Sequence, residues 1–223
     1  MGNKNVLVWG AGGHGKVTVD ALLASGEWEV AGILDEDEKK SGTEVLGVKV
    51  FSLEGGVGEA ARRLDCGRIA VAIGDNYARF EKFKQLRRAG LTAVNVVHPS
   101  AHVSRFVKMG EGVTILAGAT INPGTTIEDN VCVNTSASVD HDNLLERSCH
   151  IFPNATLTGG VRIREFAYVG SGAVIAPNLT VEKYSCVGAG AVVLTNVPEG
   201  TVVFGAPAIV HGEQKKRPGK ENS

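Results

Sequence analysis

The sequence lacks the features that mark several large classes of protein. Its 223 residues carry a formal net charge of −1, so there is no excess of basic residues of the kind that binds nucleic acid. No apolar run approaches the roughly 18 residues that a membrane-spanning helix requires. The first residues, Met1 to Asn5, lack a signal-peptide profile. We therefore expect a cytoplasmic protein without a nucleic-acid or membrane partner.

Cysteine is also scarce and shows no metal-binding pattern. The four cysteines, Cys66, Cys132, Cys149 and Cys186, contain no CxxC pair. Free thiols without an export signal agree with a reducing compartment. No metal site is expected.

What the sequence does contain is a repeat of six residues. Sixteen large aliphatic residues recur at every sixth position from Val103 to Val193, without interruption. A period of six is typical of neither an α-helix nor an alternating strand. It indicates a solenoid of short parallel strands whose aliphatic residues point into a shared core. A solenoid that serves only as a scaffold remains an alternative, because repeats alone do not specify a function.

Residues 1–98, which precede the repeats, alternate between strand and helix patterns. Strands are expected at 5–9, 29–34, 48–50, 68–73 and 92–97, and helices at 17–24, 58–64 and 77–89. This alternation predicts an α/β domain with a small parallel sheet, a Rossmann-like half. The expected organisation is therefore an α/β domain over 1–98, a β-solenoid over 99–212, and a flexible tail over 213–223.

A glycine-rich turn follows the first expected strand. Gly10, Gly12 and Gly15 fit the pattern G-x-G-x-x-G, and Asp35 lies 20 residues beyond Gly15. This is the dinucleotide fingerprint, in which glycines let the backbone approach a pyrophosphate at a helix N-terminus. The literal prediction is NAD, but residues 1–98 have room for only one mononucleotide-binding half. A different diphosphate-linked nucleotide therefore fits better, and a tight turn without a ligand is the structural alternative.

The candidate ligand-binding residues of this domain lie where its strands end. They are Gly12, Gly13, His14, Gly15, Lys16, Asp35, Gly74 and Asn76. Open α/β sheets bind ligands at the carboxyl ends of their strands, which these residues follow. Arg79 opens the next helix, where it either meets a phosphate or lies on a solvated helix face.

Within the repeats, one polar stretch stands out. His141 follows the inward-facing Val139 by two residues and therefore lies near a turn, and Asp142 follows it directly. A carboxylate raises the basicity of an imidazole and orients it, so the pair is a candidate general base. A chance surface pair is the alternative. A zinc site would need more histidines than His141 and His150 supply.

Together these motifs resemble one family. The Gly-Gly-His-Gly-Lys turn, Ile73-Gly74-Asp75-Asn76, His98-Pro99-Ser100, the Asp140-His141-Asp142 segment and Phe204-Gly205-Ala206-Pro207-Ala208 occur in one order. The chain is similar to the two-domain sugar acyltransferases that include the sialic-acid O-acetyltransferases and the nucleotide-sugar N-acetyltransferases for bacillosamine and perosamine. Ile209 departs from the pattern, since the family often has a lysine or arginine there.

The resemblance implies a left-handed β-helix, a homotrimer, and acetyl-CoA bound between subunits. It implies that His141 is the general base, Asp142 its partner, and Gly159 the donor to the oxyanion. It places Asn134 close to the sugar. It assigns residues near the coenzyme at His150, Gly159, Gly188, Ala189 and Pro207.

The expected activity is N-acetylation of the 4-amino group of a nucleotide-linked 4-amino-4,6-dideoxy sugar by acetyl-CoA, with GDP-perosamine as first choice. A UDP-linked 4-amino sugar of the bacillosamine type is the second choice, and O-acetylation of a sialic acid is the third. Two readings from other classes remain: an NAD-binding protein with a scaffolding solenoid, and a non-catalytic nucleotide-sugar sensor.

Overall fold

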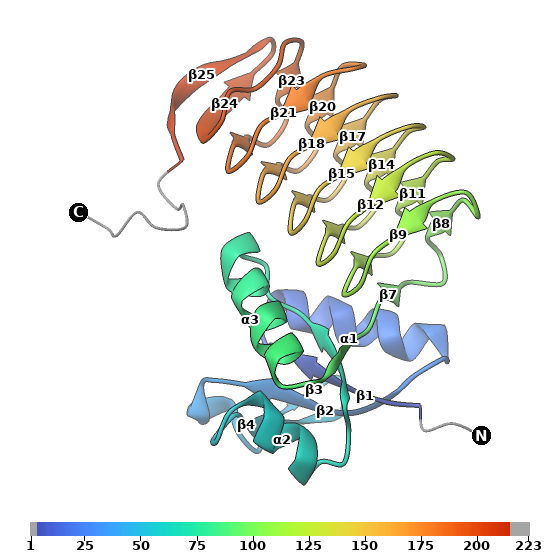
Figure 1. Cartoon of the computed structure of the whole chain (residues 1–223), viewed down its shortest axis with the longest axis vertical. Coiled ribbons are helices and arrows are strands. Elements are labelled where there is room, and N and C mark those ends of the chain that lie inside the picture. Colours follow the sequence, from blue (N-terminus) through green and yellow to red (C-terminus); the bar gives the residue numbers. More distant parts are fainter. Residues whose placement is uncertain (1–3, 215–223) are drawn as a thin grey trace. The chain divides into compact units, whose positions relative to one another are not determined.

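The computed structural model describes residues 4–214 and divides the chain after Pro99 into two compact units. In Figure 1 the first unit combines helices with a sheet, and the second is a stack of short strands. None of the helices between residues 4 and 214 has the length and apolar character needed to span a bilayer.

The first unit contains a six-stranded sheet in the order β3-β4-β2-β1-β5-β6. Strands β4, β2, β1, β5 and β6 are parallel, as the alternation predicted, but β3 pairs antiparallel with β4. Leu46 and Gly47 both have positive φ, which is the geometry of a tight two-residue hairpin turn. The elements in chain order are β1 (Asn5–Trp9), α1 (Gly13–Ser25), β2 (Glu29–Asp35), the 3-10 helix η1 (Glu38–Lys40), β3 (Glu44–Val45), β4 (Val48–Ser52), α2 (Val57–Arg63), β5 (Arg68–Val71), α3 (Asn76–Arg88), β6 (Thr92–Ala93) and β7 (Val96–Val97).

The sheet is covered by helices because its strands are apolar on both faces. Leu7 and Trp9 of β1 join a core with residues of α2 and α3. Val6 and Val8 point to the opposite face, since side chains alternate along a strand, and both are fully buried. Helix α1 packs against β1 and β2.

The glycine turn is shorter than expected, because α1 begins at Gly13 rather than near Val17. The amide of Lys16 already donates to the carbonyl of Gly12 at 3.0 Å. A Cβ atom on Gly15 would lie only 1.9 Å from the carbonyl oxygen of Gly10. The absence of a side chain at residue 15 therefore lets the first turn of α1 pack directly onto the end of β1.

The second unit is a β-helix whose strands form three sheets. Strands three hexads apart pair in parallel, for example Thr120 with Ser138 and Ser138 with Thr156. One sheet contains β8 (His102–Val103), β11 (Thr120–Ile121), β14 (Ser138–Val139), β17 (Thr156–Leu157), β20 (Val174–Ile175) and β23 (Val192–Val193). The next contains β9 (Lys108–Met109), β12 (Thr126–Ile127), β15 (Leu144–Leu145), β18 (Arg162–Ile163) and β21 (Thr180–Val181). The third includes β10 (Thr114–Ile115), β13 (Cys132–Val133), β16 (His150–Ile151), β19 (Tyr168–Val169), β22 (Cys186–Val187), β24 (Thr201–Gly205) and β25 (Ala208–Glu213).

The six-residue repeat is confirmed as the origin of this fold. Each repeated aliphatic residue is the second residue of a two-residue strand, and those from Ile115 to Val193 are buried in one continuous core. Three hexads make one coil, because each strand pairs with the third strand after it. The architecture is the left-handed parallel β-helix that was predicted.

The β-helix ends in a hairpin. Strands β24 and β25 pair antiparallel, and a cis peptide bond joins Ala206 to Pro207 between them. Glu213, expected to open the tail, is the last residue of β25, because it pairs with Thr201. Beyond Gln214, the expected tail (residues 215–223) lies outside the described residues.

Two substitutions in the glycine turn test this packing. Gly15→Ala should lower the free energy of unfolding by about 1–3 kcal/mol or more, because the added methyl group meets a backbone carbonyl that cannot move freely. Gly13→Ala is the matched control, since nothing lies within 4 Å of the position of its Cβ. Chemical denaturation of the full chain measures both. Equal stability of the two variants would contradict the close approach at Gly15.

Candidate active site

His141 and Asp142 occupy the turn between β14 and β15. The Nδ1 atom of His141 lies 2.8 Å from Oδ2 of Asp142. An ionised carboxylate can only accept a hydrogen bond, so Nδ1 carries the proton and Nε2 presents a lone pair. The His141 side chain is 61 % exposed. The geometry leaves Nε2 as an accessible proton acceptor.

The electrostatic surroundings of His141 favour its protonated form. The hydrogen bond from Nδ1 to Asp142 raises the pKa of His141 above its ordinary value, and the charge of Asp140 adds to the increase. Desolvation of the ring lowers the pKa and is weaker than either of these two effects. His141 is therefore a stronger base than a free imidazole.

Gly159, in the corresponding turn one coil further on, lies against the imidazole. A Cβ atom at residue 159 would be 2.6 Å from Cε1 and 2.7 Å from Nε2 of His141. Within the described part of the chain, no acceptor takes a hydrogen bond from the Gly159 amide. Because the residue has no side chain, the proton-accepting edge of the ring lies beside a backbone N–H that is available to a ligand.

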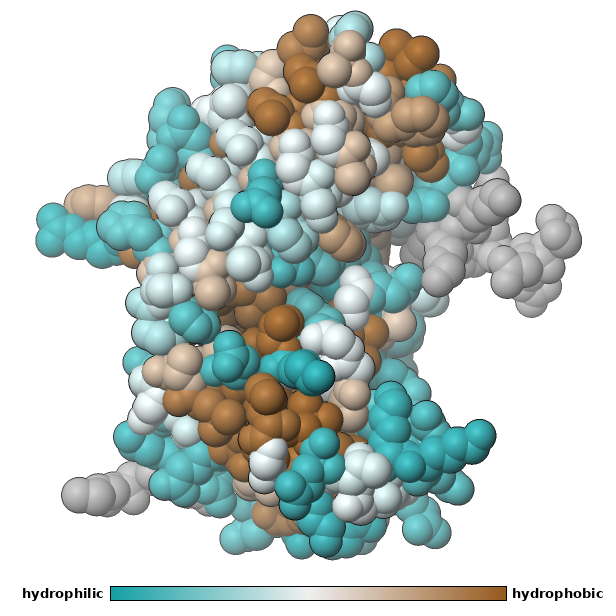
Figure 2. Space-filling model, turned by 180° about the vertical axis from the view of Figure 1, so that it is seen from behind, coloured by the Kyte–Doolittle hydropathy of each residue, from teal (hydrophilic) through white to brown (hydrophobic). Residues whose placement is uncertain are grey.

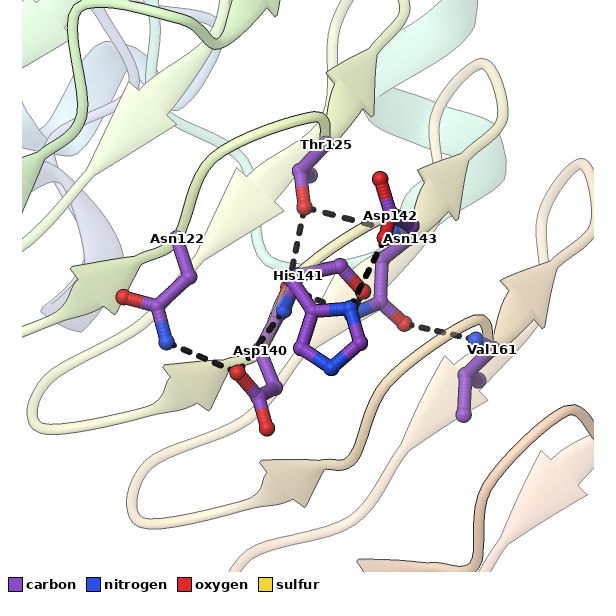
Figure 3. A network of polar contacts seen from close by, with 7 residues as sticks. All are labelled: Asn122, Thr125, Asp140, His141, Asp142, Asn143 and Val161. Carbon is purple, nitrogen blue, oxygen red and sulfur yellow. Dashed lines mark hydrogen bonds and ion pairs between the residues drawn. The ribbon is translucent and has the colours of Figure 1, made fainter.

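A buried polar network holds the turn that carries His141 (Figure 3). Asn143 is 2 % exposed. Its Nδ2 donates to the carbonyls of Asp140 at 2.6 Å and His141 at 3.3 Å, and its Oδ1 accepts from the Val161 amide at 3.0 Å. The fully buried Thr125 donates from Oγ1 to the Asp140 carbonyl at 2.9 Å. The turn is therefore bonded to the coils on both sides of it.

Asn134 and His150 form a second pair on the β-helix. The Nδ2 atom of Asn134 lies 3.2 Å from Nε2 of His150. The imidazole stacks on Phe152 with ring centroids 4.1 Å apart, and His150 is only 2 % exposed. His150 begins β16, on a different sheet from β14 and β15. The structure thus pairs Asn134 with His150 and separates both from the His141 turn.

The remaining residues expected near the coenzyme lie at the C-terminal end of the β-helix. A Cβ atom on Gly188 would be 2.8 Å from Cβ of Phe204, so Gly188 packs against the terminal hairpin, and Ala189 and Pro207 are exposed. Apolar side chains gather at this end of the molecule (Figure 2), where Phe204, Ile209 and Val210 are exposed.

In the first unit, Asp35 is connected directly to the glycine turn. Its Oδ2 accepts from the Ala11 amide at 2.7 Å and from Lys40 at 3.0 Å, and its Oδ1 accepts from the Asp37 amide at 2.9 Å. Burial alone would raise the pKa of Asp35, but these hydrogen bonds outweigh it and hold the pKa below its usual value. Asp35 is an anion that fixes the turn in place.

The same edge of the sheet is hollowed beside Asp35. A cavity of about 220 Å³ lies among the end of β1, the segments that follow β2 and β4, and helix α3. Its lining includes Trp9, Glu36, Glu38, Leu53 and Glu54. Glu36 is paired with Lys82, so Glu38 and Glu54 are the carboxylates best placed to accept hydrogen bonds from a ligand group that carries N–H donors.

The prediction that Arg79 could lie on a solvated helix face is wrong. It is 1 % exposed, so it does not lie on a solvated helix face. Its guanidinium donates to the carbonyl of Ile73 at 3.1 Å, that of Gly74 at 3.4 Å and Oδ1 of Asn76 at 3.0 Å. Arg79 thereby fixes the two candidate residues Gly74 and Asn76. The side chain of Asp75 caps α3 by accepting from the Ala78 amide at 2.9 Å.

His14 lies in the first turn of α1 and remains neutral. Burial lowers its pKa from 6.5 to about 4, and the charge of Arg79 contributes to the decrease. His14 is therefore a hydrogen-bonding group rather than a cation at neutral pH. The neighbouring Lys16 is exposed.

Sequence reasoning missed the residues that support His141. The candidates did not include Asn122, Thr125, Asp140 and Asn143. Their spacing of one coil could have indicated that they lie in contact. Asn122 precedes Asp140 by one coil, as Thr125 precedes Asn143.

Between residues 4 and 214, no group of three or more His, Cys, Asp or Glu side chains could hold a metal ion.

Comparison with known proteins finds related sequences for both units. Residues 5–86 match a family profile described as the PglD N-terminal domain. UDP-N-acetylbacillosamine N-acetyltransferase of Bacillus subtilis (strain 168) is 34% identical over 124 residues, which cover 51% of this chain and 52% of that protein. The chain thus matches about half the length of this relative. GDP-perosamine N-acetyltransferase of Escherichia coli O157:H7 is 29% identical over 171 residues, which cover 75% of this chain and 76% of that protein.

A solved structure matches nearly the whole chain. PerB from Caulobacter crescentus, in complex with CoA and GDP-perosamine, is 40% identical with a TM-score of 0.87, and the match covers 95% of this chain and 98% of that one. The same Caulobacter enzyme has also been solved with one histidine replaced by asparagine or by alanine, again with CoA and GDP-perosamine.

The neutral state of His14 predicts a pH dependence of stability. Its pKa is 6.5 in the unfolded chain and about 4 in the folded one, so the unfolded chain binds more protons between these values. Stability should therefore fall as the pH decreases from 7, by about 2 kcal/mol at pH 5. In the His14→Gln variant residue 14 cannot take up a proton, so its free energy of unfolding should fall by correspondingly less between pH 7 and pH 5.

Denaturant titrations of the two full-length chains at pH 7 and pH 5 measure the difference. The expectation fails if both chains lose the same stability between the two pH values.

Proposed function

Because the chain belongs to the family of left-handed β-helix sugar N-acetyltransferases that use acetyl-CoA, we propose that it acetylates the 4-amino group of a nucleotide-linked 4-amino-4,6-dideoxy sugar, with GDP-perosamine as first choice. The observation that carries the proposal is the arrangement of His141, Asp142 and Gly159. It supplies a proton acceptor and a backbone donor side by side on two stacked turns of successive coils.

The chemistry requires both groups. The neutral amine attacks the thioester carbonyl, the carbon–nitrogen bond forms, and the oxygen gains negative charge. Nε2 of His141 takes the proton that the nitrogen must lose, and the collapse of the intermediate breaks the carbon–sulfur bond and releases the CoA thiolate. A positioned base typically contributes about 10²–10⁴-fold, and one donor to the oxyanion on the order of 10²–10³-fold. We assign that donor to the Gly159 amide.

Asp142 supports this role by selecting the reactive nitrogen. By accepting the Nδ1 proton it orients the ring and stabilises the imidazolium that forms after proton transfer. The Asn134 and His150 pair is assigned to substrate and coenzyme contacts. Gly188, Ala189 and Pro207 are assigned to the coenzyme, as the family resemblance implies.

The first unit is assigned to the sugar nucleotide. Backbone amides at the start of α1, with Gly12, Gly13 and Gly15, suit a pyrophosphate, because a helix N-terminus carries partial positive charge. The buried charge of Arg79 adds to that field. We assign His14, Lys16, Asp35, Gly74 and Asn76 to contacts with the nucleotide or the sugar.

The carboxylates near Asp35 support guanine as the nucleobase of the substrate. The hollow beside Trp9 contains Glu36, Glu38 and Glu54. Guanine presents two adjacent N–H donors that one carboxylate can accept together, whereas uracil presents a single N–H between two carbonyl oxygens that carboxylates repel. A UDP-linked sugar of the bacillosamine type is the second candidate, because the Bacillus relative acts on such a compound.

Other readings account for fewer observations. O-acetylation of a sialic acid would use the same base, and an alcohol acceptor would need it more than an amine does. An NAD-binding scaffold or a nucleotide-sugar sensor would give no reason for the proton acceptor beside Gly159. A cytoplasmic homotrimer, with acetyl-CoA between subunits, is part of the proposal.

The release of free thiol from acetyl-CoA tests the function. Purified protein is offered GDP- and UDP-linked 4-amino sugars, beside His141→Asn, which keeps a polar side chain of similar shape. We expect faster turnover with the GDP-linked sugar and a loss of about 10²-fold or more in the variant.

Absence of turnover with every amine acceptor would overturn N-acetylation and turn attention to hydroxyl acceptors. Turnover that survives in His141→Asn would remove His141 from the role of base.

A further inference from the structure

The turn that carries His141 contains a second carboxylate, Asp140, which accepts a hydrogen bond from the His141 backbone amide, whereas Asp142 bonds to the ring. We propose that Asp140 is a positioning residue for His141, which fixes the turn through its hydrogen bonds and places a second negative charge next to the imidazole. This inference rests on the proposed function, in which His141 is the general base, and it names a further residue that supports His141.

The contacts of Asp140 run along the stack of coils. Its Oδ1 accepts from Nδ2 of Asn122, one coil earlier, at 2.9 Å, and from the backbone amide of His141 at 2.8 Å. The bond from Asn122 links Asp140 to the preceding turn. The bond from the His141 amide fixes the direction of the backbone from Asp140 to His141. Figure 3 shows the Asp140 and Asp142 side chains extending from either side of His141.

The backbone of the same residue is held separately. Oγ1 of Thr125 and Nδ2 of Asn143 both donate to the Asp140 carbonyl. Both donors are buried, so water does not compete with these bonds. The side chain of Asp140 thus extends from a restrained backbone, and its charge stays at a fixed place relative to the ring.

The electrostatic setting of His141 is simple enough to test. The turns at 122–124 and 158–160 contain no charged residue, and neither do β11, β12, β14, β15 and β17. Arg162 on β18 is exposed and has no part in the shift of the His141 pKa, which comes first from the Asp142 hydrogen bond and then from the Asp140 charge. Hydrogen bonds from Asn122 and from the His141 amide lower the pKa of Asp140, so it remains ionised where His141 titrates.

The two carboxylates therefore have separate roles. Asp142 bonds to Nδ1 and orients the ring. Asp140 raises the proton affinity of the ring through space and restrains the backbone from which the ring extends. A general base is effective when its pKa lies near the working pH, so both contributions bear on the rate.

Three variants of the full chain separate charge from hydrogen bonding. Asp140→Asn removes the charge and keeps an oxygen acceptor. Asp140→Ala removes both. Asn122→Ala is the matched control, because it removes the hydrogen bond from the preceding coil and leaves the charge. For each variant, an NMR titration follows the protonation of the His141 imidazole, whose signal is assigned by its loss in His141→Asn. The pH profile of kcat/KM is then measured with acetyl-CoA and the sugar nucleotide.

We expect the His141 titration and the acid limb of the profile to move together to lower pH in Asp140→Asn, because the imidazolium loses a stabilising charge. The plateau of Asp140→Asn should stay within about tenfold of the parent, since a weaker base costs only part of a general-base contribution. Asp140→Ala should show the same shift and a plateau lower by up to about 10²-fold, because the turn loses its restraint. Asn122→Ala should titrate like the parent.

An unshifted His141 titration in Asp140→Asn would overturn the charge role, and a parental plateau in Asp140→Ala would overturn the restraint. If the parent chain turns over no sugar, the proposed function fails, but the NMR titration still decides whether Asp140 acts on His141.

Discussion

The site depends on the hydrogen bonding between successive coils of the β-helix. Each strand pairs in register with the strand one coil later, and the turns follow the same rule. The amide of Asp142 donates to the carbonyl of Pro123, and the amide of Gly160 donates to the carbonyl of His141. These main-chain bonds stack turn on turn, so the side chain at one turn lies against the equivalent residue of the next coil. His141 therefore meets Gly159, and Asp140 meets Asn122.

The same stacking explains why a turn can hold a catalytic group rigidly. Loops are usually the mobile parts of a protein. Here the turn from Asp140 to Asn143 is bonded to a coil on each side through Thr125 and Val161. Asp142 has a φ of 58°, a left-handed conformation that a non-glycine residue adopts at some cost. The surrounding bonds stabilise that conformation, and it brings the Asp142 carboxylate to Nδ1 of its neighbour.

The sequence predicted the architecture well because the β-helix has a strict period. The aliphatic series from Val103 to Val193 placed every strand from β8 to β23, and the glycine pattern placed the start of α1 to within about a turn. The supporting polar network escaped prediction because it depends on contacts across a whole coil. Thr125 and Asn143 look like ordinary turn residues until the coil brings them together. The burial of Arg79 was missed for a different reason: its guanidinium bonds to Ile73, Gly74 and Asn76 in the preceding segment, and no sequence pattern specifies the path of that segment.

The bare backbone at residue 159 lets the His141 ring take its position, and a crystal structure of the Gly159→Ala variant is the decisive test of this dependence. A Cβ atom there would lie 2.6 Å from the ring, and a side chain moves more easily than stacked backbone. We predict unchanged coils, an imidazole displaced from residue 159, and turnover reduced by about 10²-fold, the cost typical of a misplaced catalytic group. An imidazole that keeps its place beside the added methyl group, with normal turnover, would show that the position of the ring does not depend on the missing side chain.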